Sequence, residues 1–558
     1  MFKKNVSLLI LSSLLLSGCV SPAPVSSNES ITSITSEVSS EEVSTSEETT
    51  SEETSEELED LQIRAITLLG VYEVKEIDII NKLDNETFTF EIPSDAIRIE
   101  DNKVIALRGN TKTTVKVTSS LSRTGQFNVT VRNRVYSSTH STTEVSEGWF
   151  NEVNIEKVNS LRANFANGMD ISSFKQLYDN GQKFYDKAGN ETALPLLLKD
   201  NGVNWVRLRL WVEPYDTYEE DGVTKTYLYG GGNCTTENVL WMIKECKSVG
   251  LKVLLNFHYS DFWTDPSHQI IPKAWKDIST SAELANTVYN YTKETLELFK
   301  KNNCLPDAVA LGNEIYNGLF AHNPGGITKE MRNGELPYYS YNRTERTDST
   351  NAKYDHTDSK TSVSNANLRT YLSAGARAVR KVDSSIQIMV HFVRGLSDTN
   401  GSIRFFSVIG DLDIDIYAIS AYPSSHWANI NQLKTGVATI ANAFPNKKFC
   451  IAEVSYGFTY ESDVMASNIF APSGQLKPIS EYGVNIQGQA SLIRDVTEAV
   501  SNLDNGFGVF YWEGAWTPTK NSGWADASSK VSYANQALVS YNGKALGSLE
   551  VYKKMIGN

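Results

Sequence analysis

Two glutamates, Glu314 and Glu453, each end a short apolar run of the sequence. Glu314 closes the stretch ALGNE, where Asn313 stands immediately before it, and Glu453 closes the stretch KFCIAE. A polar side chain at such a position can be an ordinary surface residue where a strand leaves the core. Two carboxyl groups brought together can instead divide the roles of a general acid and a nucleophile or base, which glycosidic bond cleavage requires. From the spacing alone, both interpretations stay open.

Both runs belong to a larger pattern in which short strand-like segments alternate with helix-like segments. The eight strand-like segments are 165–172, 204–211, 251–259, 308–314, 386–392, 416–423, 448–455 and 507–514. Eight β/α units over roughly 400 residues predict a (β/α)8 TIM barrel with loop insertions between 148 and 558. In that fold the C-terminal ends of the strands meet at one face, so polar residues that end different strands would share a site.

Polar residues end nearly all of these segments. They are Asp170, Arg207, Arg209, His258, Asn313, Glu314, His391, Tyr422, Glu453, Trp512 and Glu513. Since Glu314 ends the fourth segment and Glu453 the seventh, a barrel would place them across its mouth from each other. Arg209 and Tyr422 could then keep Glu453 ionised through opposite charge and hydrogen bonding. Asn313 could hydrogen-bond a sugar 2-hydroxyl.

The chain is rich in aromatic residues, with ten Trp and 26 Tyr, which can pack in a core or grip sugar rings. Trp512, at the end of the eighth segment, is the first candidate for a sugar platform, and Trp263 and Trp427 could extend a groove. His258 is expected to form a hydrogen-bonding wall, because no second His lies at metal-ligand spacing on the same element. Asp170 could bind substrate hydroxyls or have a structural role.

Several pieces of this region resemble the galactanase family, glycoside hydrolase family 53. Between residues 164 and 516 they are GMDISS, GVNWVRLRLWVEP, GLKVLLNFHYSDFWTDPSHQIIPKAW, ALGNEIYNGL, ISAYPSSHW, IAEVSYGF, VNIQGQASLIRDV and GVFYWEGAW. The segment LNFHYSDFWTDP with its trailing PKAW is specific, whereas GNE alone occurs across a whole clan of barrels. The resemblance implies retaining endo-hydrolysis of β-1,4-galactan, the side chain of type I arabinogalactan and pectin, with no cofactor required for catalysis. It gives Glu314 the acid/base role and Glu453 the nucleophile role.

Two other functions stay open. The chain could be another β-glycanase of the same barrel clan, acting on β-glucan or β-mannan, or a surface galactan-binding protein with a decayed site. The LNFHYSDFWTDP segment favours galactan as the substrate over β-glucan and β-mannan. The presence of both glutamates argues against a decayed catalytic site. The folded part of the chain is close to neutral and has no basic stripe, which argues against a nucleic-acid partner.

Two loops depart from the family pattern. The polar, tyrosine-containing segment 323–365, which follows the fourth strand, is longer than expected, and we hypothesise that it forms a flap over the groove. In many bacterial relatives the loop after the nucleophile holds calcium. Here the corresponding loop reads YESDVMASN and offers oxygens from Glu461, Asp463 and Asn468, but it lacks the glycines that let a loop wrap tightly around calcium. Structural calcium is therefore possible but disfavoured.

The N-terminus predicts export. Residues 1–19, MFKKNVSLLILSSLLLSGC, carry two lysines before a short apolar run, as a secretory signal does. Leu16-Ser17-Gly18-Cys19 resembles a bacterial lipobox, so Cys19 would be lipidated and would anchor the chain at the cell surface. A plain signal peptide and a secreted protein is the alternative. Residues 20–60 hold 12 Asp and Glu but no Lys or Arg, and predict a disordered, extended tether.

Residues 61–135 alternate apolar and polar residues between turn signals and predict a small all-β sandwich. The piece IEDNKVIALRGNTKTTVKVTSSLSRTGQFNVTV resembles bacterial Ig-like repeats of the second group, which implies a spacer or adhesion module. The chain as a whole is predicted to be a monomer that contacts the membrane only through its lipid. Its expected partner is plant cell-wall galactan or arabinogalactan.

Overall fold

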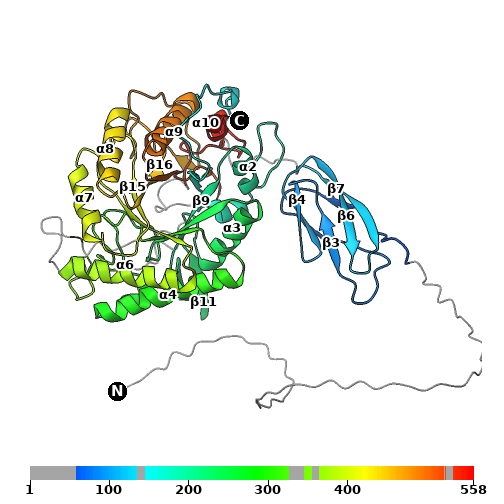
Figure 1. Ribbon diagram of the computed structural model, residues 1–558, viewed down its shortest axis with the longest axis horizontal. Coiled ribbons are helices and arrows are strands. Elements are labelled where there is room, and N and C mark those ends of the chain that lie inside the picture. The colour runs from blue at the N-terminus through cyan, green and yellow to red at the C-terminus, as the bar shows by residue number, and fades with distance from the viewer. Residues whose placement is uncertain are drawn as a thin grey trace, which may run out of the picture. The chain divides into compact units, whose positions relative to one another are not determined.

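The computed structural model describes residues 58–134, 145–325, 345–352, 354, 363–520, 522 and 532–557. The signal peptide with Cys19, the tether up to residue 57, and much of the 323–365 insertion lie outside the described residues. Within the compact unit Glu59–Asn558, the described residues form a small β domain and a closed barrel (Figure 1).

The small β domain consists of two sheets. One contains β1 (Ile66–Leu68), β7 (Thr124–Val131), β6 (Thr111–Ser119) and β3 (Phe88–Glu91), and the other contains β2 (Val74–Glu76), β5 (Lys103–Ala106) and β4 (Ile97–Glu100), each in that order. Buried side chains from both sheets, including Val104, Val115 and Val129, form one core cluster. The prediction of a β sandwich is therefore confirmed, while its specific likeness to Ig-like repeats stays a prediction.

The barrel closes through eight parallel strands. In order they are β8 (Ala166–Asp170), β9 (Trp205–Leu210), β12 (Lys252–Phe257), β13 (Ala308–Leu311), β14 (Gln387–Phe392), β15 (Ile416–Ser420), β16 (Lys448–Val454) and β18 (Gly506–Tyr511), which pairs with β8. Seven of them lie within the segments expected from the sequence, and β18 begins one residue before the expected segment 507–514. The TIM-barrel prediction is therefore confirmed.

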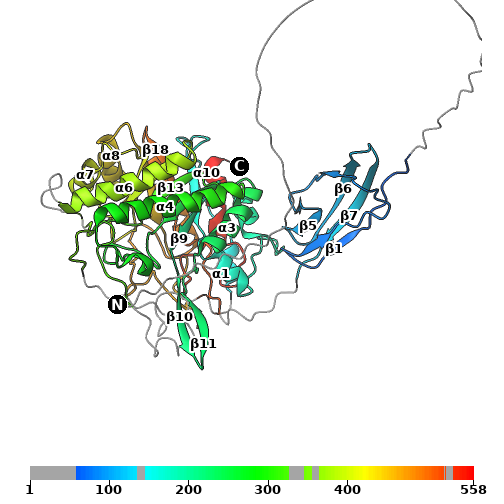
Figure 2. The ribbon, with the colours of Figure 1, turned by 90° about the horizontal axis from the view of Figure 1, so that it is seen from below.

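Helices surround the strands, as Figure 1 shows. They are α1 (Phe174–Asp179), α2 (Leu194–Asp200), α3 (Thr236–Ser248), α4 (Ser281–Lys301), α6 (Val363–Val382), α7 (Thr399–Val408), α8 (Ile430–Asn442), α9 (Ile486–Ser501) and α10 (Val551–Ile556). The long helices α4 and α6 pack side by side on the outside of β13 (Figure 2). Among the described residues, no helix is long and apolar enough to cross a membrane.

Short elements decorate the barrel. The 3-10 helices are Glu147–Phe150, Lys273–Trp275 and Gly547–Glu550, and the remaining strands are β10 (Tyr215–Glu220), β11 (Val223–Leu228), β17 (Ala466–Ser467) and β19 (Ser532–Tyr533). The β10–β11 pair is an antiparallel hairpin that projects from the barrel (Figure 2). The strands β17 and β19 pair in parallel, which links the loop after β16 to the loop after β18.

The barrel interior determines where polar side chains emerge. It is filled by a buried apolar cluster that includes Ala166, Trp205, Leu254, Ala310, Ala418 and Cys450. Because side chains alternate along a strand, the residues two and four positions further on also point inward. Arg207 and Arg209 follow Trp205 on β9 in this way, and Ser420 and Tyr422 follow Ala418 on and after β15. The polar residues of the barrel are thus concentrated at one end.

Glu453 is an exception to this alternation. Cys450 and Ala452 both belong to the interior cluster, so strict alternation would point Glu453 outward. The register between β16 and β18 shifts between Ile451 and Val454, and the register between β15 and β16 shifts at Ser420. Such irregularities re-aim side chains and are common beside active sites. Here the shift lets Glu453 face the same space as Glu314.

Candidate active site

A groove of about 480 Å³ opens where the polar strand ends meet. Six residues expected from the sequence line it: Trp263, Asn313, Glu314, Tyr422, Glu453 and Trp512. They come from the loop after β12 and from the ends of β13, β15, β16 and β18. The structure therefore brings together the two glutamates, the amide beside one of them and three aromatic side chains.

Glu453 is held at both carboxyl oxygens. The Tyr422 hydroxyl donates to Oε2 at 2.7 Å, and the Arg207 guanidinium pairs with Oε1 at 2.8 Å. Burial raises the pKa of Glu453, whereas the charge of Arg207 and the hydrogen bond from Tyr422 lower it. These two contacts therefore favour the ionised form of a carboxyl group that is only 6 % exposed.

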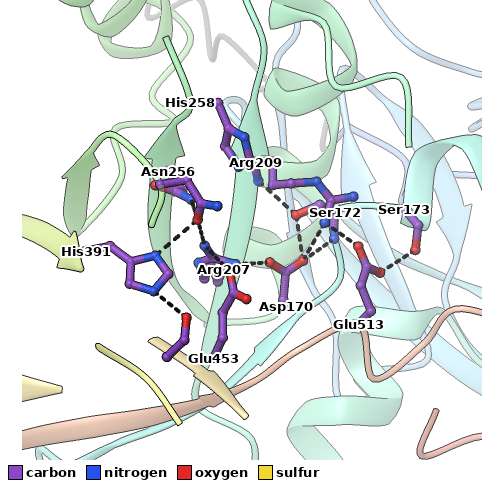
Figure 3. A network of polar contacts seen from close by, with 12 residues as sticks. Asp170, Ser172, Ser173, Arg207, Arg209, Asn256, His258, His391, Glu453 and Glu513 are labelled. Carbon is purple, nitrogen blue, oxygen red and sulfur yellow. Dashed lines mark hydrogen bonds and ion pairs between the residues drawn. The ribbon is translucent and has the colours of Figure 1, made fainter. Parts of the chain in front are cut away.

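Arg207, and not Arg209, is the direct partner of Glu453. The Arg207 guanidinium also donates to Asp170 Oδ2 at 2.6 Å (Figure 3). It donates to Asn313 Oδ1 at 2.6 Å as well. Arg209 pairs instead with Glu513, and its guanidinium carbon lies 3.8 Å from the centre of the Trp263 ring. The expectation that Arg209 keeps Glu453 ionised is met only through its charge, which lowers the pKa of Glu453 without a direct bond. The bonded cation is Arg207, which the sequence-based expectation did not include for this role.

Glu314 lies on a sharply turned backbone. Gly312 and Glu314 adopt left-handed conformations, with φ of 86° and 47°, which glycine accepts easily and glutamate does not. Such strained residues concentrate at functional sites. The turn directs the Glu314 carboxyl group into the groove, where Oε1 lies 2.5 Å from the Ser420 hydroxyl.

The environment of Glu314 favours its protonated form. Burial first, and the nearby charge of Glu453 second, raise the pKa of Glu314 well above its ordinary value. Among the described residues, no cation is bonded to Glu314 in the way that Arg207 is bonded to Glu453. Two carboxyl groups whose surroundings differ in this way can divide acid and nucleophile roles.

Four of the expected substrate-binding residues lie behind the groove surface. Asp170, Arg209, His258 and Trp427 are at most 2 % exposed and do not line the groove. His258 Nδ1 interacts with the Thr264 hydroxyl at 3.0 Å, and Trp427 Nε1 donates to the Ala421 carbonyl at 2.7 Å. These contacts support the walls of the site, and the geometry gives no support to a direct contact of these four side chains with substrate.

The aromatic residues of the groove are packed against one another. The Trp512 ring centre lies 6.2 Å from that of Trp263 and 6.3 Å from that of Tyr422. Behind Trp263, the ring of Trp516 stacks nearly parallel to it, with the centres 6.3 Å apart. The aromatic wall is therefore held in place from behind and leaves Trp512 and Trp263 at the groove surface.

The loop after β16 does not fit a calcium site. Asn468 Nδ2 donates to the carbonyl oxygens of Tyr460 at 2.8 Å and Glu461 at 3.3 Å, and the Tyr541 hydroxyl donates to the latter at 2.5 Å. Asp463 Oδ1 accepts from the Met465 amide. Because N–H and O–H donors engage the oxygens that a cation would need, the loop is closed by hydrogen bonds. Within the described ranges, no group of three or more His, Cys, Asp or Glu could hold a metal ion.

We therefore expect the melting temperature of the protein to be the same in calcium and in a chelator. Replacing Asn468 by Asp keeps the side-chain size but removes the two N–H bonds, and should lower stability by about 1 kcal/mol. Thermal unfolding of both proteins, each with calcium and with chelator, measures this. A chelator-induced drop in the melting temperature of the unmodified protein would contradict the expectation.

A closed eight-stranded β/α barrel with one glutamate at the end of its fourth strand and another at the end of its seventh defines a glycosidase. The comparison with protein families identifies which glycosidase family this is. The family model of Glycosyl hydrolase family 53 matches residues 166–552. The chain belongs to this family, in agreement with the motifs of its sequence.

Relatives and a solved structure agree with this placement. The endo-beta-1,4-galactanase of Bacillus subtilis (strain 168) is 32% identical over 73% of this chain and 90% of its own length. The arabinogalactan endo-beta-1,4-galactanase of Cellvibrio japonicus is 28% identical over 65% of this chain and 85% of its own. The solved GH53 catalytic domain from Ignisphaera aggregans is 33% identical, with a TM-score of 0.59, and covers 72% of this chain and 99% of its own.

Proposed function

We propose that the protein cleaves internal β-1,4-galactosidic bonds of pectic galactan and type I arabinogalactan, with retention of configuration. The observation that carries this proposal is the pair of unequally held carboxyl groups, Glu314 and Glu453, facing one groove in a barrel of family 53. The proposed substrate, galactan, is taken from the names of the related galactanases. No cofactor takes part in the proposed reaction.

In the first step, Glu314 donates its proton to the glycosidic oxygen while the carboxylate of Glu453 attacks the anomeric carbon. The bond between that carbon and the leaving sugar breaks, and a covalent glycosyl-enzyme forms on Glu453. In the second step, Glu314 takes a proton from water, and the water oxygen displaces Glu453 from the anomeric carbon. Retention requires the two carboxyl groups to lie about 5–5.5 Å apart.

The surrounding residues have supporting roles in this scheme. Arg207 and Tyr422 stabilise the ionised Glu453 before attack and after its release. Trp512 would stack against the sugar at the cleavage point, and Trp263 would extend the platform along the groove. Asn313 remains the candidate for the sugar 2-hydroxyl, since it lines the groove beside Glu314.

A panel of polysaccharides tests the substrate. We expect the protein to release reducing ends from β-1,4-galactan, and none above background from cellulose or β-mannan. The products should be oligosaccharides from the first minutes, because cleavage is internal. Equal or higher activity on β-mannan or β-glucan would favour another glycanase of the clan. Binding to galactan without hydrolysis would favour a decayed, galactan-binding protein.

We also propose that the barrel acts at the bacterial cell surface as a monomer. The lipobox-like sequence ending in Cys19 and the acidic stretch 20–60 support a lipid anchor followed by an extended tether. The β sandwich would serve as a spacer between the tether and the barrel. A Cys19→Ala variant that stays with the membrane fraction to the same extent as the unmodified protein would argue against the lipid anchor.

A further inference from the structure

A chain of three hydrogen bonds runs from the interior of the barrel to Glu314. Asn313 Oδ1 lies 3.1 Å from His391 Nδ1, His391 Nε2 lies 2.9 Å from Ser420 Oγ, and Ser420 Oγ lies 2.5 Å from Glu314 Oε1 (Figure 3 shows the two contacts of His391). Ser420 and His391 are fully buried and do not line the groove. Their role is therefore to act on Glu314 and not to contact substrate.

The direction of the first bond follows from the contacts of Asn313. Its amide nitrogen donates to the Thr264 carbonyl at 2.7 Å, so its other side-chain atom is the oxygen. That oxygen also accepts from Arg207 at 2.6 Å and from the Asn256 amide at 2.9 Å. An oxygen can only accept, and His391 Nδ1 must therefore carry a hydrogen. Burial first, and the charge of Arg207 second, lower the pKa of His391 well below its ordinary value. A neutral ring has one N–H, so Nε2 is an acceptor.

The second and third bonds follow from the first. Because His391 Nε2 accepts, the Ser420 hydroxyl must donate its only hydrogen to it. Ser420 Oγ can then only accept from Glu314, and Glu314 Oε1 must carry a proton. The network is fully satisfied in one arrangement, in which every hydrogen points from Glu314 towards Asn313.

Loss of the Glu314 proton breaks this arrangement. If the Ser420 hydroxyl turned to donate to the carboxylate, its oxygen lone pairs would face the bare Nε2 of His391. If His391 moved its hydrogen to Nε2 instead, bare Nδ1 would face the Asn313 oxygen at 3.1 Å. Either way two buried acceptors are left without a hydrogen between them, which is unfavourable.

We propose that Ser420 and His391 are positioning residues that hold Glu314 in its protonated form and so keep it ready to act as the acid. This inference rests on the proposed function only in the use that it gives to the proton. It also accounts for two strand-end residues, His391 and Ser420, to which neither the sequence motifs nor the groove lining gives a role.

Other charged groups also act on this network. Glu453 on β16, Asp265 in the loop after β12 and Arg207 on β9 act on Glu314, and Arg207 and His426 act on His391. Glu453 and Asp265 raise the pKa of Glu314, and Arg207 lowers it. A Ser420 hydroxyl that donated to the Glu314 carboxylate would lower it as well, whereas in the arrangement derived above Ser420 accepts from Glu314. All of these charged groups remain when the Ser420 hydroxyl is removed. A change in the titration of Glu314 on that substitution therefore reports on the network alone.

The test is the pH dependence of kcat/KM on galactan for Ser420→Ala. The alkaline limb reports the loss of the Glu314 proton. The variant removes an acceptor of the protonated form, so this limb should move to lower pH by about one unit. The acidic limb, set by Glu453, should stay in place. Ser420→Thr, which restores a hydroxyl, should return the alkaline limb towards its original position.

The opposite result would overturn the inference. If Ser420 mainly donates to an ionised Glu314, its removal destabilises the carboxylate and moves the alkaline limb to higher pH. An unmoved limb would also overturn the inference.

If Ser420→Ala does not fold, the tautomer of His391 in the unmodified protein tests the inference instead. Nitrogen NMR of histidine-labelled protein should find the hydrogen on Nδ1, and a hydrogen on Nε2 would refute the network. This measurement needs no substrate, so it stands even if galactan is not cleaved.

Discussion

Replacement of Glu314 by Ala is expected to lower kcat/KM on galactan by roughly 10²- to 10⁴-fold. The variant lacks both the proton for the leaving sugar and the base that activates water. The loss should be much smaller for the first step on an aryl galactobioside, whose phenolate leaves without a proton. Burst kinetics on that substrate would then show rapid phenolate release followed by slow turnover, because the glycosyl-enzyme on Glu453 accumulates.

Azide distinguishes the two glutamates. In Glu314→Ala, azide can attack the glycosyl-enzyme without base assistance, and the product should be a galactosyl azide of retained β configuration. In Glu453→Ala, no glycosyl-enzyme can form, and azide attacking from the vacated side should give the α configuration. Glu297→Ala, which removes an exposed glutamate of the outer helix α4, is the control and should leave kcat/KM unchanged. Azide products of the same configuration from Glu314→Ala and Glu453→Ala would contradict the assignment of Glu314 as acid/base and Glu453 as nucleophile.

The sequence predicted the barrel well because its strands are short, apolar and separated by amphipathic helices. The site pair was predictable for a related reason. A buried parallel strand needs no polar residue until it ends, so a carboxylate directly after an apolar run marks the C-terminal face. Glu314 and Glu453 both satisfy this pattern, and both line the groove.

The choice between Arg207 and Arg209 was not predictable in the same way. Both lie on the inward face of β9, and only the depth of each side chain decides which carboxylate it meets. Arg207 reaches Glu453, whereas Arg209 lies one layer nearer the rim and meets Glu513. The irregular register of β16, which turns Glu453 inward, has no clear signal in the sequence.

The roles of the aromatic residues depend on burial, which their sequence positions do not reveal. Trp512 and Trp263 line the groove, but Trp427 is buried with its ring N–H bonded to the Ala421 carbonyl. All three follow strands and are chemically alike, so the sequence cannot separate a platform from a core residue. Ser420 was overlooked although it stands two residues before Tyr422 in the motif ISAYP, and therefore on the same face of the strand.

Replacement of Arg207 by Met should have the largest combined effect on stability and on pH dependence. Arg207 is buried and bonds Asp170, Asn313 and Glu453. Its removal leaves the buried carboxylate of Glu453 without its bonded cation, whereas Asp170 keeps Arg209 at 3.5 Å. Loss of one partner of a buried ion pair costs about 3–5 kcal/mol. Arg207→Lys should rescue only partly, because an ammonium group cannot present the planar fork that bridges these partners.

The sign of the pH effect follows from the role of Arg207. Its charge lowers the pKa of Glu453, so its loss raises that pKa further. The acidic limb of kcat/KM should therefore move to higher pH, and activity should partly recover as the pH rises. Stability behaves in the opposite way. A carboxyl group whose folded pKa lies above its unfolded value binds more protons in the folded state, so the stability that it contributes is lost as the pH rises through the folded pKa.

Arg209→Met is the matched control, since it removes a buried arginine from the same face of the same strand. It should also lower the melting temperature, because Glu513 loses its cation and Trp263 its support. It should move the acidic limb of kcat/KM far less than Arg207→Met, because Arg209 is not bonded to Glu453. Equal shifts of the acidic limb in the two variants would mean that the ionisation of Glu453 depends on the total positive charge near it and not on one bonded partner. A shift confined to Arg207→Met would mean that one ion pair sets the ionisation of the nucleophile.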